Sequence, residues 1–389
     1  MKFTYSIPTK ILFGPGSFND LATTPLPGKK ALVVITAGKS MRANGYLDRL
    51  IDMLDKQGIG HALFDKILPN PVLRHVHEGA ALAREQGCDF VIGLGGGSSI
   101  DSAKSIAVMA KNPGDYWDYI SGGSGKGQPL VNGALPIVAI ATTAGTGSEA
   151  TPNAIVAVPE QELKVGIVSD AMIADNVLLD PLMIKNLPRK IAAATGVDAL
   201  AHAIECYTSN KANPISDTFA LEALDMILNN ILPACDSADA VSQKSAMQLA
   251  SFYAGVAITA SGTTAVHALS YPLGGKYHIA HGVSNAILLA PVMRFNAPAC
   301  PERFAAAYDR CVHGEKTCVT QEEKTEFMLR WLEKIVRHLE IPTSLSAFGV
   351  SASDLETLVA AGMQVTRLLN NNLRPVTADD ARALYRRIL

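Results

Sequence analysis

Cysteine is scarce in this chain, and no two of the six cysteines form a C-x-x-C pair. The spacing typical of paired redox or metal-binding thiols is therefore missing. The first eight residues also lack the apolar core and the small-residue cleavage site of a signal peptide. We therefore expect a cytoplasmic protein with reduced thiols.

Runs of one charge are also missing. No cluster of basic residues stands out, and the formal net charge is only -2. This balance argues against a nucleic-acid partner and against an anionic membrane surface. No apolar run is long enough to span a bilayer, and neither a repeat of fixed period nor a low-complexity segment is present.

The remaining composition is that of a globular protein. The chain has 389 residues, of which 48% are hydrophobic and 18% charged. This length is enough for two domains that each bury a full core.

Short β-rich runs alternate with helical stretches in the first half of the chain. We expect strands at residues 31–36, 60–64, 89–94 and 136–141, and helices at residues 41–57 and 76–86. Such alternation is typical of βαβ units in a parallel sheet that helices cover on both faces. The prediction for residues 1–187 is therefore a Rossmann-like α/β domain that binds a dinucleotide.

After residues 186–188 the composition changes to long stretches rich in Ala and Leu. We expect helices at residues 190–208, 214–232, 240–260, 322–339 and 353–369. The prediction is thus an α-helical domain at residues 188–389 that binds a metal and the substrate. Two such domains would leave a cleft between them, which is a usual place for a ligand.

A glycine-rich turn, GGGSSIDSAK at residues 95–104, follows a predicted strand and opens a predicted helix. Its glycines allow close approach of a pyrophosphate, and the helix start attracts the negative charge. Ser98 and Asp101 have the spacing of a helix-start box. The turn is not the G-x-G-x-x-G fingerprint, because Ile100 stands at the third glycine position. An ordinary tight turn is the alternative.

Two further loops bear on nucleotide binding. The segment TTAGTGSE at residues 142–149 follows the next strand, and its hydroxyl groups are suited to line a dinucleotide. A polar connecting loop is the alternative interpretation. The triplet Gly38-Lys39-Ser40 is not a Walker motif, because Val33 stands where that motif requires its first glycine.

The chemistry of the second half centres on Asp198, His202, His267 and His281. Asp198 and His202 stand four residues apart in a helical segment, so their side chains share one face. Both surrounding segments are apolar, and four polar groups in an interior are most simply explained by a shared ion. One carboxylate and three imidazoles suit ferrous iron or zinc. A metal that binds an alcohol oxygen lowers its pKa, which favours hydride transfer.

These motifs together resemble the iron-dependent (group III) alcohol dehydrogenases. The matching segments are GGGSSIDSAK at 95–104, TTAGTGSE at 142–149, ATGVDALAHAIE at 194–205, residues 267–282 and NNLRP at 371–375. The resemblance extends from Tyr5 to near the C-terminus. It implies the fold that this family shares with glycerol dehydrogenases and dehydroquinate synthases, and it implies a homodimer or larger homo-oligomer.

By this resemblance, Asp198, His202, His267 and His281 are the metal ligands. Gly96, Gly97 and Ser98 would hold the cofactor pyrophosphate, and Asp101 belongs to the same motif. The dinucleotide would be lined by Thr142, Thr143, Thr146, Asn153, Lys164 and Leu182. For Lys164, a solvated strand position is the alternative.

The sequence departs from the family pattern near the nucleotide ribose and near the substrate. Gly38 stands where relatives that prefer NAD often carry an Asp, and Lys39 or Arg42 would attract a 2′-phosphate. NAD and NADP therefore both stay open. Tyr271 replaces a second histidine of many relatives, and Ile258 replaces an aromatic residue. The substrate shape is therefore open as well.

Other polar residues near the motifs receive separate interpretations. His278 lies close to His281, but the family pattern does not make it a ligand. Glu205 falls on the helix face of Asp198, where it either orients an imidazole N–H or is a plain surface carboxylate. Lys276 and Arg294 either select an anionic substrate or are surface charges.

The predicted function is a metal- and NAD(P)-dependent alcohol dehydrogenase, or aldehyde reductase in reverse, for a small primary alcohol or diol. One alternative is a lyase or polyol dehydrogenase of the dehydroquinate synthase and glycerol dehydrogenase type. The other alternative is a non-catalytic member of the family that binds a nucleotide.

Overall fold

The computed structural model describes residues 2–120, 125–158 and 163–389, which form two compact units. The first, here called the α/β unit, comprises Ser6–Thr143 and Gly147–Ile184. The second, here called the helical unit, comprises Lys185–Leu389 with Ala144–Thr146 and the first residues of the chain. The domain boundary expected between residues 187 and 188 stays a prediction.

The α/β unit contains a parallel sheet of six strands in the order β1-β8-β5-β4-β2-β3. The strands are β1 (Lys10–Phe13), β2 (Lys30–Thr36), β3 (Gly60–Ile67), β4 (Phe90–Gly95), β5 (Ile137–Ala141) and β8 (Asn176–Leu179). A separate antiparallel pair is formed by β6 (Asn153–Val158) and β7 (Leu163–Val168). The four strands predicted from the sequence are all in the parallel sheet.

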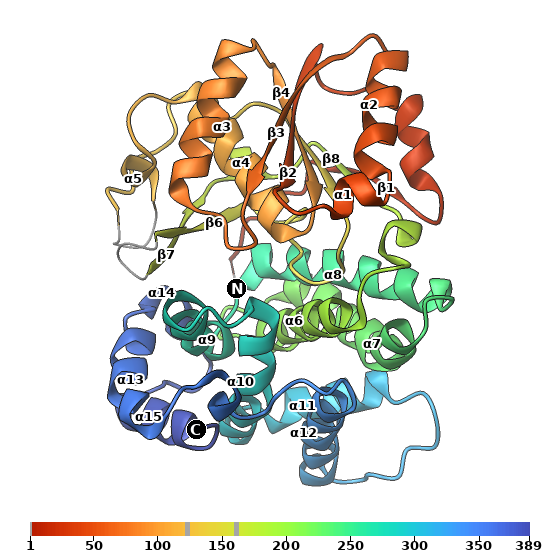
Figure 1. Cartoon of the computed structure of the whole chain (residues 1–389). Coiled ribbons are helices and arrows are strands. Elements are labelled where there is room, and N and C mark those ends of the chain that lie inside the picture. The colour runs from red at the N-terminus through yellow and green to blue at the C-terminus, as the bar shows by residue number, and fades with distance from the viewer. Residues whose placement is uncertain (1, 121–124, 159–162) are drawn as a thin grey trace. The chain divides into compact units, whose positions relative to one another are not determined.

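Helices cover both faces of this sheet, and Figure 1 shows α2 and α3 on opposite sides of it. The helical elements are η1 (Ser17–Ala22), α1 (Ser40–Ala43), α2 (Tyr46–Lys56), α3 (Leu73–Glu85), α4 (Gly97–Lys111), α5 (Tyr116–Tyr119), η3 (Asp170–Met172) and η4 (Pro181–Ile184). Because both faces are covered, the central strands are continuous apolar runs without alternating polar residues.

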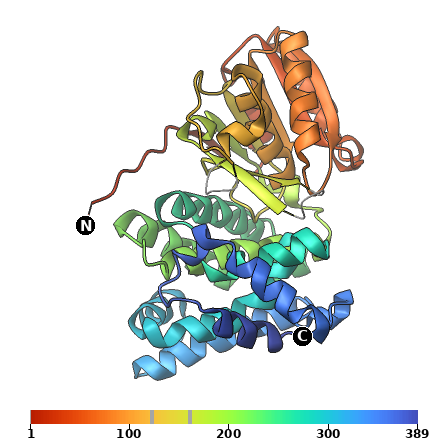
Figure 2. The same ribbon diagram turned by 90° about the vertical axis from the view of Figure 1, so that its left-hand side faces the viewer.

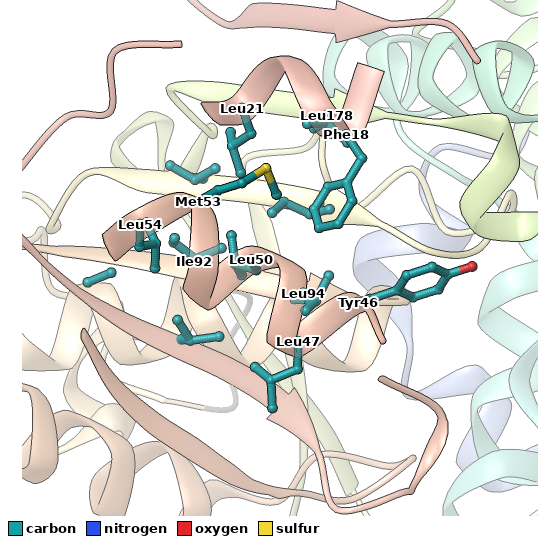
Figure 3. Packing of buried hydrophobic residues seen from close by; sticks show 14 of the residues in the cluster. Phe18, Leu21, Tyr46, Leu47, Leu50, Met53, Leu54, Ile92, Leu94 and Leu178 are labelled. Carbon is teal, nitrogen blue, oxygen red and sulfur yellow. The ribbon is translucent and has the colours of Figure 1, made fainter. Parts of the chain in front are cut away.

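One face of the sheet forms a core with α2 and η1, which Figure 3 shows from close by. Val33 and Ile92 on the strands, Leu50 on α2 and Phe18 on η1 are all fully buried in it. On the other face Gly93 of β4 lets α4 approach closely, because a Cβ there would lie 3.0 Å from the Cα of Ile100. The glycine is thus needed for the packing of the helix that opens with the glycine turn.

The single helix predicted at residues 41–57 is wrong. The chain forms α1 and α2 there, and Gly45 between them has φ 68°, in the left-handed region. A glycine adopts this conformation without steric cost, so the helix ends and restarts. The predicted helix at residues 76–86 is confirmed as α3.

All long elements after residue 188 are helices, which Figures 1 and 2 show from two directions. They are α6 (Arg189–Tyr207), α7 (Pro214–Asp236), α8 (Val241–Ser261), α9 (Ala265–Lys276), α10 (His281–Asn296), η5 (Ala297–Ala299), α11 (Pro301–Cys311), α12 (Gln321–His338), η6 (Leu345–Phe348), η7 (Ala352–Asp354), α13 (Leu355–Met363), α14 (Thr366–Leu369) and α15 (Ala378–Arg386). The predicted fold class, a Rossmann-like α/β part followed by an α-helical part, is confirmed.

Within the helical unit the prediction of one helix at residues 353–369 is wrong. The segment is divided into η7, α13 and α14, and Val365 has ψ 51°, outside the helical region. Gly362 and the β-branched pair Val365-Thr366 have low helix propensity, which explains the interruption. The other four predicted helices correspond to α6, α7, α8 and α12.

No single helix among the described residues has both the length and the apolar composition needed to cross a bilayer. Helices α8 and α9 meet these two conditions only when taken together, and they are bent by 107° relative to each other.

Leu50 tests the core between α2 and the sheet. We expect Leu50→Ala to lower the free energy of unfolding by about 2–5 kcal/mol, because the cavity removes buried contacts. Asp52→Ala, at an exposed position of the same helix, is the control and should change stability by less than about 0.5 kcal/mol. Urea unfolding of both variants measures the difference, and equal midpoints would contradict this packing.

Candidate metal centre and nucleotide-binding turn

Three helices of the helical unit carry the four candidate metal ligands. Asp198 and His202 lie one turn apart on α6, His267 lies in the first turn of α9, and His281 is the first residue of α10. Asp198, His202 and His267 are buried, and the His281 side chain is 34% exposed. The structure therefore brings together all four residues that the sequence pattern singled out.

The ligand atoms of these four residues lie within 4.8 Å of one another. The Nε2 atoms of His267 and His281 are each 3.6 Å from Oδ1 of Asp198, and Nε2 of His202 is 3.9 Å from it. Tetrahedral ligands bonded to an ion at about 2.1 Å would stand about 3.4 Å apart. Donor types and spacing thus fit a first-row divalent cation, and zinc and iron fit equally.

Two of the imidazoles are held by hydrogen bonds at their other ring nitrogen. The Nδ1 of His202 lies 3.2 Å from the backbone oxygen of Gly145, to which Nδ1–H donates. The Nδ1 of His267 makes a short hydrogen bond to Oε2 of Glu205. With the proton on Nδ1, each Nε2 keeps its lone pair for a metal ion.

Glu205 is fully buried, so its interpretation as a surface carboxylate is wrong. Its Oε1 accepts hydrogen bonds from the backbone N–H of Thr264 and Val266 at 3.0 and 2.8 Å, and from the Thr264 hydroxyl at 2.8 Å. These donors surround the start of α9, where the helix dipole also favours a negative charge. Glu205 therefore ties α6 to α9 and orients His267.

The charges of the cluster shift the pKa values of its members. Burial alone would raise the pKa of Asp198, but the three imidazoles lower it well below its usual range. Burial lowers the pKa of His202. Burial would also lower the pKa of His267, but Glu205 and Asp198 outweigh it and raise that pKa to about 9. The carboxylates thus make this buried site attractive to positive charge.

Two glycines allow the close packing on which the cluster depends. A Cβ on Gly145 would lie 2.6 Å from the backbone oxygen of Thr195 on α6. A Cβ on Gly282 would lie 2.1 Å from the backbone oxygen of Ala194. Neither position has room for a side chain. Gly145 supplies the backbone oxygen that binds His202, and Gly282 directly follows His281.

Comparison with known proteins agrees with this geometry. Residues 8–181 match the family model of iron-containing alcohol dehydrogenases, and residues 192–389 match the model of the C-terminal part of that family. The chain belongs to the iron-containing alcohol dehydrogenase family. The predicted family and the predicted enzyme class, an oxidoreductase, are confirmed.

Relatives of known name are similar over nearly the whole chain. Long-chain-alcohol dehydrogenase 1 of Geobacillus thermodenitrificans is 35% identical over 92% of this chain and 89% of its own length. The 1,3-propanediol dehydrogenase of Klebsiella pneumoniae is 34% identical over 95% of this chain and 94% of its own. A solved 1,3-propanediol oxidoreductase matches with TM-score 0.92 and 32% identity over 100% of both chains. These names favour an alcohol dehydrogenase over the lyase alternative.

Three other residues of the helical unit, His278, Tyr271 and Arg294, were singled out from the sequence. His278 is exposed, has a positive φ of 55° and lies outside the four-residue cluster, as expected. The ring of Tyr271 lies 6.3 Å from the ring of His281. Arg294 binds Glu326 and Glu333 at 2.8 and 2.7 Å. These two carboxylates neutralise Arg294, which favours its interpretation as a surface charge over an anion-selecting role.

The glycine turn of this alcohol dehydrogenase lies between β4 and α4. Gly96 is the N-cap of α4, and Gly97 and Ser98 form its first turn, where no side chain of the described residues caps the helix. A Cβ on Gly96 would lie 3.1 Å from Thr143. The helix start therefore keeps backbone N–H groups available for an anion.

The predicted helix-start box of Ser98 and Asp101 is wrong. The Ser98 hydroxyl donates to the backbone oxygen of Pro69 at 2.6 Å, and Asp101 accepts from the backbone N–H of Ile155 at 3.0 Å. Asp101 is turned toward β6, where the backbone N–H of Ile155 binds its carboxylate. The three-residue spacing fits a capping box, but tertiary contacts decide the partners.

The remaining candidate cofactor residues are distributed over both units. Thr142 and Thr143 follow β5 in the α/β unit, whereas Thr146 groups with the helical unit. Asn153 begins β6, Lys164 lies on β7, Leu182 is an exposed residue of η4, and Gly38 precedes α1. Contacts between described residues link Gly96 with Thr143, and charge interaction links Asp101 with Lys164.

Sequence reasoning missed two buried groups behind the turn. Lys104 is fully buried, and its ammonium donates to the backbone oxygens of Thr151 and Asn153 at 2.6 and 3.0 Å. Glu149 is buried, and its Oε1 has no hydrogen-bond partner in the described part of the chain. The i, i+3 spacing of Asp101 and Lys104 was the only signal for this cluster. Burial raises the pKa of Glu149 to about 7 and lowers that of Lys104 to about 8.

We expect Glu205→Gln to weaken metal binding by about 10–100-fold, because a glutamine can present N–H to His267 and favour the wrong tautomer. Competition for Zn²⁺ with a chelator measures the affinity. Glu222→Gln, at a partly exposed carboxylate of α7, is the matched control and should bind as the wild type does. Equal affinities of Glu205→Gln and Glu222→Gln for Zn²⁺ would show that Glu205 does not support metal binding.

The free energy of unfolding should depend on pH through Glu149. Because its pKa in the folded protein, about 7, exceeds the ordinary value of 4.5, its favourable contribution is present below pH 4.5 and is lost as the pH rises through about 7. Glu149→Gln does not titrate, so its stability relative to the wild type should increase by about 3 kcal/mol between pH of about 4.5 and 8.

Urea unfolding at several pH values measures this difference, with Glu85→Gln at an exposed position of α3 as the control for the amide itself. A difference that stays constant over this range would show that Glu149 is ionised in the folded protein.

Proposed function

We propose that this protein oxidises a small primary alcohol or diol to the aldehyde, and reduces the aldehyde in the reverse direction, with NAD or NADP. The convergence of four ligand atoms within 4.8 Å is the observation that carries the proposal. Membership of the family and the names of its alcohol and diol dehydrogenases support this reaction.

Asp198, His202, His267 and His281 are the proposed ligands of Fe²⁺, with Zn²⁺ as the alternative ion. When bound, the cation would supply a Lewis acid that lowers the pKa of the alcohol, and the nicotinamide would supply the hydride acceptor. Asp198 is the single carboxylate among the four proposed ligands, so these ligands and a divalent cation would together carry one positive charge, which would favour an anionic oxygen.

The residues of the chain supply orientation and access. Glu205 and the backbone of Gly145 hold two imidazoles so that their Nε2 atoms face Asp198. Of the four ligands, His281 has the most exposed side chain. We propose that the alcohol arrives, and its proton leaves to solvent, on the side of His281.

For the nucleotide, the proposed pyrophosphate site is the start of α4 with Gly96, Gly97 and Ser98. The Ser98 hydroxyl already donates to Pro69, so its backbone N–H is the group offered to a phosphate. The further proposed cofactor residues are Gly38, Asp101, Thr142, Thr143, Thr146, Asn153, Lys164 and Leu182. The free helix start and the close packing of Gly96 against Thr143 support this assignment.

The region of Gly38 bears on the choice between NAD and NADP. Gly38 brings no carboxylate to repel a 2′-phosphate, and Lys39 next to it is exposed. Arg42 is paired with Asp65 at 2.6 Å, which reduces its attraction for a phosphate. We therefore propose that both cofactors are accepted.

A cytoplasmic homo-oligomer is also proposed. All six cysteines are free in the structure, which supports a reducing compartment. The family resemblance supports the assembly into a homodimer or larger oligomer.

The proposal is tested by His267→Ala. We expect the wild type to bind about one Fe²⁺ per chain and the variant to lose this metal, with a loss of alcohol oxidation on the order of 10³-fold or more. His278→Asn is the matched control, because His278 is exposed and asparagine readily adopts its positive φ. Metal analysis and the formation of NADH or NADPH over a panel of alcohols are the measurements.

Undiminished metal and activity in His267→Ala would overturn the metal assignment. Metal binding without turnover of any alcohol, with either NAD or NADP, would favour the non-catalytic alternative.

A further inference from the structure

Asn285 is a buried amide among the candidate metal ligands. It lies on α10 one turn after His281, and none of its surface is exposed. Its Nδ2 lies 2.7 Å from Oδ1 of Asp198, 3.0 Å from Nε2 of His267 and 3.3 Å from Nε2 of His281. The amide nitrogen therefore contacts three of the four ligand atoms.

The other end of this amide has no partner. Oδ1 of Asn285 is buried and accepts no hydrogen bond from any of the described residues. A buried acceptor without a donor costs about 1–3 kcal/mol. Among the described residues, the polar contacts of the side chain therefore all point into the ligand cluster.

Asp198 is the ligand whose orientation matters most in this cluster. Its Oδ1 is the common neighbour of the three Nε2 atoms, at 3.6 to 3.9 Å. Rotation of the carboxylate about its side chain would remove this shared oxygen from all three imidazoles at once. A donor at 2.7 Å opposes that rotation, because an ionised carboxylate forms strong hydrogen bonds.

We propose that Asn285 is a positioning residue of the metal centre, whose Nδ2–H group holds Asp198 in the orientation that binds the cation. This inference rests on the proposed function, because it assumes that Asp198 is a ligand. It adds a neutral residue that sets how tightly the ion is held and with what geometry.

A leucine at this position separates the proposed role from a purely structural one. Leucine has the branched shape of asparagine, although its methyl groups are larger, and it removes both polar atoms, so Oδ1 of Asp198 loses its donor at 2.7 Å. Metal binding should weaken by about 10–100-fold, as for other residues that orient a ligand. A residue needed only for packing would show the opposite pattern, with lost stability and unchanged affinity.

The experiment uses the full chain and Co²⁺ alone as the probe. Affinity is measured by competition with a chelator, the rate of metal loss by excess chelator, and the coordination geometry by the visible absorption of Co²⁺. The variants are Asn285→Leu and, should leucine disturb folding, Asn285→Ala. Ser284→Ala removes another buried polar group of α10, one that bonds to the backbone of Ile279 at 3.5 Å, and is the matched control.

We expect both Asn285 variants to bind about one Co²⁺ per chain with 10–100-fold lower affinity, faster loss and an altered absorption band. Ser284→Ala should behave as the wild type does. Wild-type affinity and absorption in both Asn285 variants would overturn the inference and leave the proposed function standing. Binding of Co²⁺ by His267→Ala as tight as by the wild type would overturn the proposed function, and this inference with it.

Discussion

Bringing one buried carboxylate, two buried imidazoles and the partly exposed imidazole of His281 into the same small volume is the constraint on which the helical unit depends. Each of these groups would be costly in an apolar interior without partners, and together they offer the donor set of a divalent cation. The chain meets this constraint with further polar contacts. Glu205, Gly145 and Asn285 each bind one or more of the four residues, so three helices are tied together at one point.

Gly145 and Gly282 are needed because of the same constraint. Helix α6 carries two ligands and is approached by two backbone segments that leave no space for a Cβ. The close approach of Gly145 lets its backbone oxygen reach His202. The close approach of Gly282 places the start of α10, and with it His281, against α6. Small residues in these segments are thus a requirement of the metal centre and not only of helix packing.

In the α/β unit the corresponding constraint is a helix start that offers free N–H groups. Lys104 and Glu149 lie buried behind it and Asp101 lies half-buried, and Lys104 also donates to backbone oxygens of the β6 region. The family resemblance covers both units, whereas Gly38 and Tyr271 are departures from it. The departures lie where the nucleotide ribose and the substrate are expected, so they bear on specificity and not on the type of reaction.

The sequence by itself determined the two classes of fold, the strands and most long helices, because apolar periodicity and glycine turns are local properties. It also identified Asp198 and His202 as partners, since four residues along a helix always share a face. The helix break at Gly45 follows from a local property, the freedom of glycine at positive φ. Only the tertiary structure decided the real partners of Ser98 and Asp101 and the burial of Glu205. They depend on which backbone segments meet across long separations, and no local spacing encodes that. Asn285 combines a local and a tertiary property. The sequence places it four residues after His281, but only the packing of α10 against α6 and α9 brings its amide to three ligand atoms.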